Sequence, residues 1–318
     1  MRVKFWGTRG SIPTPMNTDE LRAKIRQLLK SIQNVDLSSD ESIDCFLDSM
    51  PMPDSMTFGG DTPCIEICEG DDTMIVDCGS GLRRLGRHMM NNGVTPGKRI
   101  NIFITHTHWD HIMGFPFFAP ALEEKTEIHI YGAHPNLRER FEQQMDLVHF
   151  PITIDDMSAD FTFHQIETGK SVTIGPFRID TAALNHPGGS YSYRITAGGK
   201  SLVIATDGEY NNNGSDTLHS VEHYRNADLL IFDAMYPTLE ETVTKEDYGH
   251  STAVIGIDIA LESNVKKLAL FHHNPDSDDL LIADTYAKAL DYLISRKTAY
   301  PGSNLSLVAT YDGLVLEV

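Results

Sequence analysis

The sequence has few cysteines and no long apolar run, and both deficits narrow the class of protein. Its 318 residues include only four cysteines. They form neither a CxxC pair nor a dense framework, which favours reduced thiols over disulfides. No apolar stretch is long enough to cross a bilayer, and the first strand-like run breaks into a turn at Gly7, too early for a secretory signal. We therefore expect a cytoplasmic protein without a membrane segment.

Basic residues are also scarce. The chain has 26 Lys and Arg against 45 Asp and Glu, for a formal net charge of −19 at pH 7. A protein that grips a nucleic-acid backbone usually needs basic side chains to displace condensed counterions. A long nucleic acid is therefore not the expected partner, whereas a small-molecule substrate remains open. Excess acid can also serve solubility alone, so the charge excludes one substrate class without choosing another.

Short apolar runs alternate with helical patterns along the chain. Strands are expected at residues 3–6, 64–69, 74–77, 100–105, 177–183, 191–196, 202–206, 229–232 and 268–271, and helices at 82–92, 252–263 and 280–296. Segments 305–309 and 314–317 are expected to form a closing hairpin around Asp312 and Gly313. The pattern predicts an α/β fold in two similar halves, as one domain over residues 1–318.

Residues 16–57 interrupt this alternation. Apolar side chains recur there at helical spacing, at Leu21, Ile25, Leu28, Leu29 and Ile32. Ser38 and Glu41 form a predicted capping box before a second helix, which is expected to end near Pro51. We expect a helical insertion and not a separate domain. Its candidate roles are a lid, a homodimer contact or a simple surface elaboration.

The densest set of candidate ligands follows the strand expected at 100–105. It consists of His106, His108, Asp110 and His111, a set suited to borderline metals such as zinc. Alternate residues of extended backbone point to the same side, so His106 and His108 can hold one ion. Asp110 and His111 lie where the chain turns helical and can reach a second ion. The alternative is a surface histidine cluster, which is less favoured because further candidate ligands follow downstream.

Three of these further candidates lie at or just after apolar strands, namely His186, Asp207 and His272. A carboxylate at the end of a buried strand, as at Asp207, is costly unless it is hydrogen-bonded or bound to a metal. His186 lies in a turn, where a lone histidine would more often be a satisfied loop residue. One of the adjacent His272 and His273 is expected to be a ligand, and the sequence defines no role for His273.

With these residues in this order, the chain resembles the metallo-β-lactamase superfamily. The resemblance implies a four-layer αββα sandwich with the site at one edge of its two sheets. It implies one metal on His106, His108 and His186, a second on Asp110, His111 and His272, and Asp207 shared between them. Two divalent metal ions are therefore expected as cofactors, zinc first, with manganese or iron as alternatives.

A second motif narrows the resemblance. Residues 248–253 resemble the His-Ser-Thr motif of the branch that contains tRNase Z and related phosphodiesterases, and Asp233 stands where that branch has a Glu that orients the histidine. The resemblance thus implies a pair of His250 and Asp233. Asp77 is a candidate to brace a ligand histidine, and Asp61 stands where relatives often carry Asn. A turn role is the alternative for Asp61 and Asp77.

The resemblance implies a dinuclear hydrolase with Asp110, Asp233 and His250 as its catalytic residues. The substrate that best suits the acidic chain is a small phosphodiester such as a cyclic nucleotide, attacked by a hydroxide that bridges the metals, with His250 protonating the leaving alkoxide. The alternatives are a tRNA 3′-processing endonuclease, a lactone or ester hydrolase, and a di-iron oxygen or redox sensor. No basic arm that would capture tRNA is found between Asp110 and His250.

Aromatic residues in segments 114–118 and 149–151 are candidates to line a nucleobase pocket. Core packing is the favoured alternative for these side chains.

Overall fold

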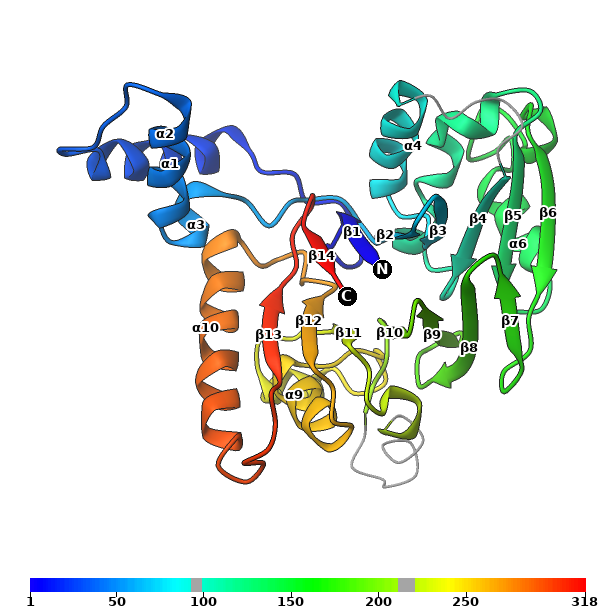
Figure 1. The fold of residues 1–318 in the computed structure, drawn as a ribbon. Helices are drawn as coiled ribbons and strands as arrows, with labels where there is room; N and C mark the ends of the chain where they lie inside the picture. The colour runs from blue at the N-terminus through cyan, green and yellow to red at the C-terminus, as the bar shows by residue number, and fades with distance from the viewer. Residues whose placement is uncertain (93–98, 211–220) are drawn as a thin grey trace.

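Two facing β-sheets form the centre of the molecule (Figure 1). The computed structural model describes residues 1–92, 99–210 and 221–318. In order across the first sheet lie β14 (Val315–Glu317), β1 (Arg2–Gly7), β2 (Cys64–Glu69), β3 (Asp72–Val76), β4 (Arg99–Ile104), β5 (Glu127–Gly132) and β6 (Asp160–Gln165). The second contains β13 (Ser306–Ala309), β12 (Lys267–Phe271), β11 (Leu229–Asp233), β10 (Lys200–Ala205), β9 (Ser190–Ala197), β8 (Phe177–Leu184) and β7 (Ser171–Ile174).

Each sheet contains a parallel part and an antiparallel part. Strands β3 to β6 are parallel in the first sheet, and β10 to β13 are parallel in the second. Parallel strands end at one edge, so residues that follow them in the sequence meet there. This edge is where the candidate ligands were expected.

The predicted closing hairpin is wrong. Strand β13 pairs in parallel with β12, whereas β14 pairs with β1 of the other sheet. The carboxylate of Asp312 accepts hydrogen bonds from the amides of Gly60 and Asp61, each at 3.0 Å. The Asp-Gly pair therefore sits where the chain crosses between the two sheets. Turn chemistry predicts a reversal but does not say which strands pair on either side of it.

Helices cover the outer face of both sheets. Buried apolar residues of α4 (Gly81–Asn91) and α6 (Leu137–Gln144) pack against the first sheet. Those of α9 (Ala253–Glu262) and α10 (Asp279–Arg296) pack against the second. A third apolar cluster, which includes Phe103, Ile204 and Phe271, fills the space between the sheets. The predicted αββα sandwich is confirmed, and so are the helices expected at 82–92, 252–263 and 280–296.

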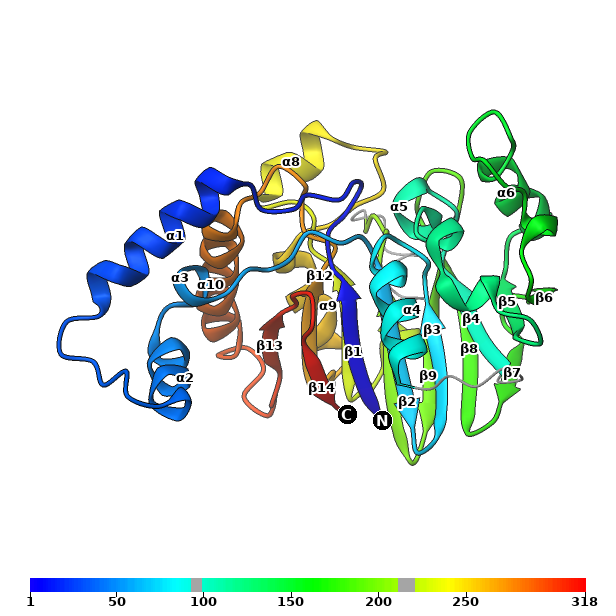
Figure 2. The ribbon, with the colours of Figure 1, turned by 90° about the horizontal axis from the view of Figure 1, so that it is seen from above.

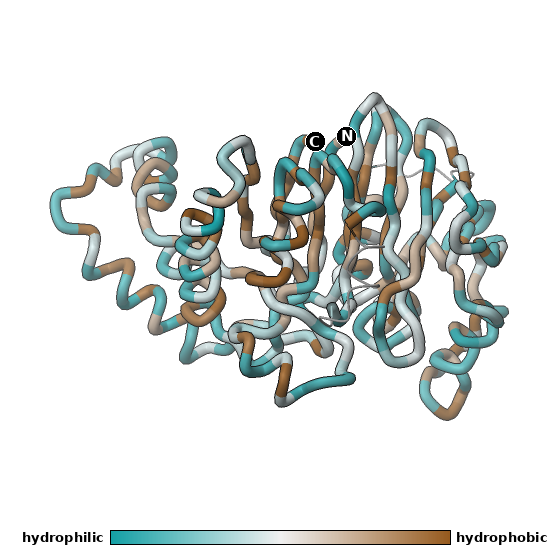
Figure 3. The backbone as a smooth tube through the Cα atoms, turned by 90° about the horizontal axis from the view of Figure 1, so that it is seen from below, coloured by the Kyte–Doolittle hydropathy of each residue, from teal (hydrophilic) through white to brown (hydrophobic). Residues whose placement is uncertain are grey.

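The insertion is helical, as predicted. It contains α1 (Thr18–Ser31), α2 (Asp40–Ser49) and α3 (Met52–Ser55), which extend away from the sheets beyond α10 (Figures 1 and 2). None of the residues in these three helices is buried, and hydrophobic segments recur along the exposed tube (Figure 3). The capping box of α2 lies one residue later than predicted, on Ser39 and Ser42, because either of two adjacent serines can cap a helix.

Two further expectations concern cysteines and membrane segments. All four cysteines are free thiols, as predicted. Among the helices of the described residues, none combines the length and the apolar character that a bilayer crossing requires.

Candidate metal centre

The candidate ligands lie where strands of both sheets end. His106 and His108 follow β4, and Asp110 and His111 belong to the one-turn helix α5 (Trp109–Ile112). His186 follows β8, Asp207 follows β10 and His272 follows β12. Asp207 and His272 have positive φ angles, of 57° and 63°, which non-glycine residues seldom adopt. The backbone therefore turns sharply at these strand ends, and the side chains converge on the shared edge.

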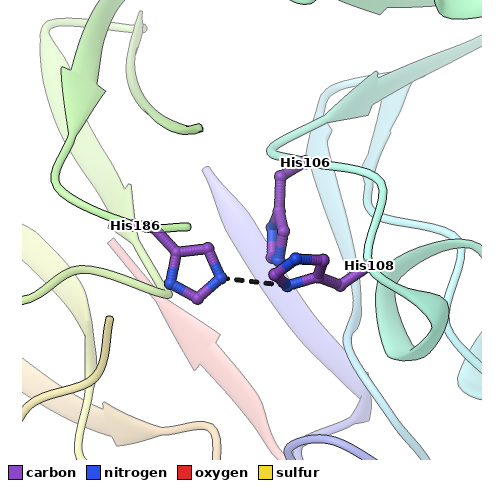
Figure 4. A group of neighbouring side chains, drawn as sticks. All are labelled: His106, His108 and His186. Atoms are coloured by element: carbon purple, nitrogen blue, oxygen red, sulfur yellow. Dashed lines mark hydrogen bonds between the residues drawn. The ribbon is translucent and has the colours of Figure 1, made fainter. Parts of the chain in front are cut away.

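Three imidazoles form the first group of candidate ligands, and they point toward one another (Figure 4). Ring nitrogens of His106, His108 and His186 lie within 4.8 Å of one another, and His186 Nε2 lies 3.0 Å from His108 Nδ1. His106 Nε2 is buried and has no hydrogen-bond partner among the described residues, which is costly for a polar atom. Ligand atoms around tetrahedral zinc are about 3.3 Å apart. A cation among the three rings fits this spacing and would satisfy His106.

Two carboxylates and two imidazoles form the second group. His111 Nε2 lies 3.3 Å from Asp110 Oδ2 and 3.2 Å from Asp207 Oδ2. His272 Nε2 lies 3.1 Å from Asp110 Oδ2 and 3.3 Å from Asp207 Oδ1. Asp207 also approaches the first group, because its Oδ1 is 3.8 Å from His106 Nε2. Its position between the groups fits a ligand shared by two cations. The structure thus brings together all seven residues singled out from the sequence.

Surrounding groups fix the orientation of the candidate ligands. His111 Nδ1 donates to Asp77 Oδ2 at 2.8 Å, so Nε2 is the nitrogen that faces the second group. His186 Nδ1 donates to the carbonyl of Gly249 at 2.9 Å, which leaves its Nε2 for the first group. The amide of Ser11 donates to Asp110 Oδ2 at 2.8 Å. The sequence signalled Asp77, but it did not signal Ser11, since a backbone amide has no residue signature.

Burial and charge set the protonation of the candidate ligands. Burial lowers the pKa of His106 well below its usual value and also lowers the pKa of His108 and of His186. These imidazoles are therefore neutral at pH 7, the form that binds metal. Burial opposes the ionisation of Asp110 and Asp207, but the neighbouring imidazoles outweigh it and hold the pKa of both carboxyls well below the usual range. Burial lowers the pKa of His111, but the carboxylates of Asp207, Asp110 and Asp77 outweigh it and raise this pKa well above the usual value. A cation at the second group would therefore displace a proton from His111, whereas the neutral imidazoles of the first group can bind a cation directly.

His250 and Asp233 form a hydrogen-bonded pair beside the second group. His250 Nδ1 donates to Asp233 Oδ2 at 2.8 Å and lies 3.7 Å from Asp207 Oδ1. Burial lowers the pKa of His250, but the Asp233 carboxylate outweighs it, and the pKa rises to about 9. Asp233 also accepts the amides of Asp207 and Met235. Its oxygens are thus occupied by hydrogen bonds, and the shorter Asp still reaches the histidine.

The remaining candidates lie outside the two groups. His273 Nε2 donates to the carbonyl of Thr310 at 2.8 Å, so His273 joins two strand ends. Asp61 Oδ1 accepts the hydroxyl of Ser80 at 2.7 Å. Among the aromatic candidates, Phe115 and Phe118 are fully buried, as the core-packing alternative predicted. Phe117 is instead 55% exposed and stands edge-on to Phe150.

Comparison with known proteins is consistent with this geometry. A profile of the Beta-lactamase superfamily domain matches residues 73–273. Ribonuclease Z of Picrophilus torridus is 26% identical over 297 residues, and the match covers 78% of this chain and 91% of that protein. The metallo-beta-lactamase fold protein YhfI from Bacillus subtilis superposes with a TM-score of 0.63 at 21% identity, covering 100% of this chain and 98% of that one. Human tRNase Z, short form, gives 0.60 at 19% identity, covering 100% and 99%.

Proposed function

Since the chain belongs to the beta-lactamase superfamily and is a metal-dependent hydrolase of the metallo-β-lactamase fold, we propose that it hydrolyses a small phosphodiester such as a cyclic nucleotide. The observation that carries this proposal is the His250–Asp233 pair beside the candidate ligands. Hydrolysis of a phosphodiester releases an alkoxide that needs a proton. Hydrolysis of an ester or lactone also releases an alkoxide, so a turnover screen that includes a lactone separates the two reactions.

We propose that His106, His108 and His186 hold one divalent cation, that Asp110, His111 and His272 hold a second, and that Asp207 is shared. Zinc is the proposed ion because imidazole and carboxylate together are its usual ligands. When bound, two such cations would supply an activated water and neutralise negative charge on the phosphate. The unpartnered nitrogen of His106 supports the first site. Metal analysis of the purified protein tests ion identity and stoichiometry.

His250 is the proposed proton donor to the leaving group. Its Nδ1 is committed to Asp233, so Nε2 is the atom left for the substrate. The ring stacks on His272, with centroids 5.1 Å apart, and stands edge-on to Tyr236. These contacts hold the ring in one orientation beside the second group, as positioning of a general acid requires. Asp233 acts through His250 and is a positioning residue.

The second candidate function is 3′ processing of tRNA, favoured by the 26% identity to a protein named Ribonuclease Z. The formal charge of −19 counts against it, because binding a long polyanion relies on basic residues. A small phosphodiester needs only the local charge at the site. The two functions separate in a turnover screen that includes both substrates.

The test combines such a screen with one variant pair. The substrates are bis(4-nitrophenyl) phosphate, cyclic nucleotides, precursor tRNA and a lactone. His250→Ala should reduce turnover of the preferred phosphodiester on the order of 100-fold or more while leaving the metal content unchanged. His88→Ala, which removes an exposed histidine on α4, is the control and should match wild type. Loss of metal from His250→Ala, or unchanged turnover, contradicts the role of His250. Faster cleavage of the lactone than of any phosphodiester contradicts the proposed function.

For residues 16–57 we propose a contact with a second copy of the chain instead of a lid. Leu21, Ile25 and Leu29 are 49%, 45% and 63% exposed along one face of α1, a surface that soluble proteins usually cover. Helix α1 carries four basic and two acidic residues, whereas α2 carries four acidic and no basic ones. In a two-fold dimer, α1 of each copy can face α2 of the other with opposite charge.

A further inference from the structure

A cavity of about 770 Å³ lies beside the candidate metal centre, between α5 and α6. Thr107 and Trp109 line it, and in the sequence they flank the candidate ligand His108. The volume falls within the range of small-molecule sites. The cavity thus adjoins the segment that carries His106, His108 and Asp110, and none of the seven candidate ligands is among the residues that line it.

The wall formed by Trp109 is unusual for a soluble protein. The indole is 79% exposed, although tryptophan normally gains a large free energy from burial. In the sequence it lies between two candidate ligands, His108 and Asp110, as the first residue of α5. An exposed aromatic surface at the rim of a cavity is suited to stacking against a planar ring.

Arg140 supplies a positive charge at the same cavity. Its Nη1 donates to Thr107 Oγ1 at 2.8 Å, and no carboxylate pairs with its guanidinium among the described residues. Arg138, on the same helix, instead pairs with Glu142 and Asp155, each at 2.6 Å. An arginine held in place and free of acidic partners is an anchor for a phosphate or other anion.

We propose that this cavity binds the nucleoside part of a nucleoside phosphate, with the base stacked on Trp109 and the phosphate beside Arg140. Asn136, Glu139 and Gln143 also line the cavity, and their amide and carboxylate groups can pair with the edge of a base. A lipid tail would form no favourable contact with these polar groups. The identity of the ligand as substrate rests on the proposed function, but its binding can be measured without turnover.

The first test uses fluorescence, because the chain has only two tryptophans. Trp6 is half-buried and donates to Glu66 at 3.0 Å, so Trp6→Phe leaves Trp109 as the only indole. AMP should quench its emission saturably, whereas ribose 5-phosphate should not. Arg140→Gln should weaken AMP about 10-fold without changing the affinity for adenosine. If Trp6→Phe does not fold, the difference in emission between wild type and Trp109→Phe measures the same signal.

No saturable quenching by millimolar AMP, or equal quenching by ribose 5-phosphate, overturns the nucleoside site. Saturable quenching by AMP without turnover of any phosphodiester supports the nucleoside site and contradicts the proposed function. Turnover of cyclic nucleotides without quenching removes the site and leaves the proposed function standing.

The second test separates binding from turnover. Trp109→Ala should raise KM for a cyclic nucleotide by about 10- to 100-fold, with a smaller change in kcat and with metal content retained. Ile294→Ala is the control, because Ile294 is also exposed, at 67%, but lies on α10 and is not part of the cavity. An equal loss of kcat on every phosphodiester in Trp109→Ala, together with loss of metal, would mean that Trp109 only supports the loop, and it overturns the proposal.

Discussion

Replacing Gly249 by alanine tests how His186 is held in the first group of ligands. Gly249 has a φ of +81°, and a Cβ built there lies 2.1 Å from His186 Nδ1 and 2.6 Å from Pro187 Cδ. The same nitrogen donates to the Gly249 carbonyl at 2.9 Å. An added methyl group cannot be accommodated at these distances. The imidazole must therefore shift and lose its approach to His108.

The magnitude follows from two separable costs. The left-handed backbone alone costs an alanine about 1–2 kcal/mol. Gly199 shares this conformation, with a φ of +75°, but no atom of the described part of the chain lies within 4 Å of an added Cβ. Gly199→Ala therefore pays the backbone cost without the clash and is the matched control. Loss of the support to a metal ligand typically weakens metal affinity by about 10- to 100-fold, and we expect at least this difference between the two variants.

The assay is competition with a chelating dye, together with metal analysis of both variants. In urea denaturation, both variants should lose unfolding free energy relative to wild type, because both have the left-handed backbone cost. Any further loss from the clash should appear only in Gly249→Ala. Metal affinity should fall only in Gly249→Ala. Equal metal affinities for Gly249→Ala and Gly199→Ala would refute the argument that Gly249 keeps His186 in place.

Two further predictions concern assembly and pH. Light scattering should give wild type a molar mass of twice the 35.5 kDa of the chain, and Ile25→Asp should lower the mass to that of the monomer. The control Val243→Asp, at a 76% exposed site on α8 (Leu239–Thr244), should leave the dimer mass unchanged. A monomeric wild type contradicts the dimer. Burial raises the pKa of Asp312 from 3.8 to about 6, so its ionisation destabilises the folded state as pH rises through this window. Asp312→Asn keeps an acceptor for the amides of Gly60 and Asp61. It should raise the unfolding free energy by up to ~3 kcal/mol at pH 7.5 but hardly at all below pH 4. A gain that does not depend on pH contradicts the raised pKa of Asp312.

The parts of the fold predicted from sequence are those with strong local patterns. Central strands such as β4 and β12 are short apolar runs, and α10 has a long amphipathic repeat. Strands β6 and β7 were missed, because at the sheet edges their residues are half-exposed and their alternation is weak. The interior strand β5 was missed as well, because its apolar run is short and His129 interrupts it. The partner of β14 was also missed, since pairing between distant segments depends on packing that no local pattern encodes.

The residues of the candidate site likewise differ in whether the sequence alone could reveal them. Its seven proposed ligands could be found because imidazoles and carboxylates at strand ends are chemically conspicuous. The amide of Ser11 and the carbonyl of Gly249 contact these ligands but belong to the backbone, which every residue has. Arg140 reaches Thr107 from another helix, and no spacing in the sequence connects the two. Contacts made through space by common groups therefore set the limit of prediction.

At three strand ends of the site, the backbone adopts a left-handed conformation that most residues disfavour. Asp77, Asp207 and His272 each adopt a positive φ, where glycine is the least strained residue and Asn, Asp and His are the most frequent others. A left-handed residue at this point turns the chain at once and leaves its side chain at the shared edge. Glycine would relieve the strain, but at Asp207 it would remove the carboxylate whose negative charge a cation needs. The residue type at these positions thus follows from the chemistry of the site, and the surrounding sheets supply the stability that the strained turns cost.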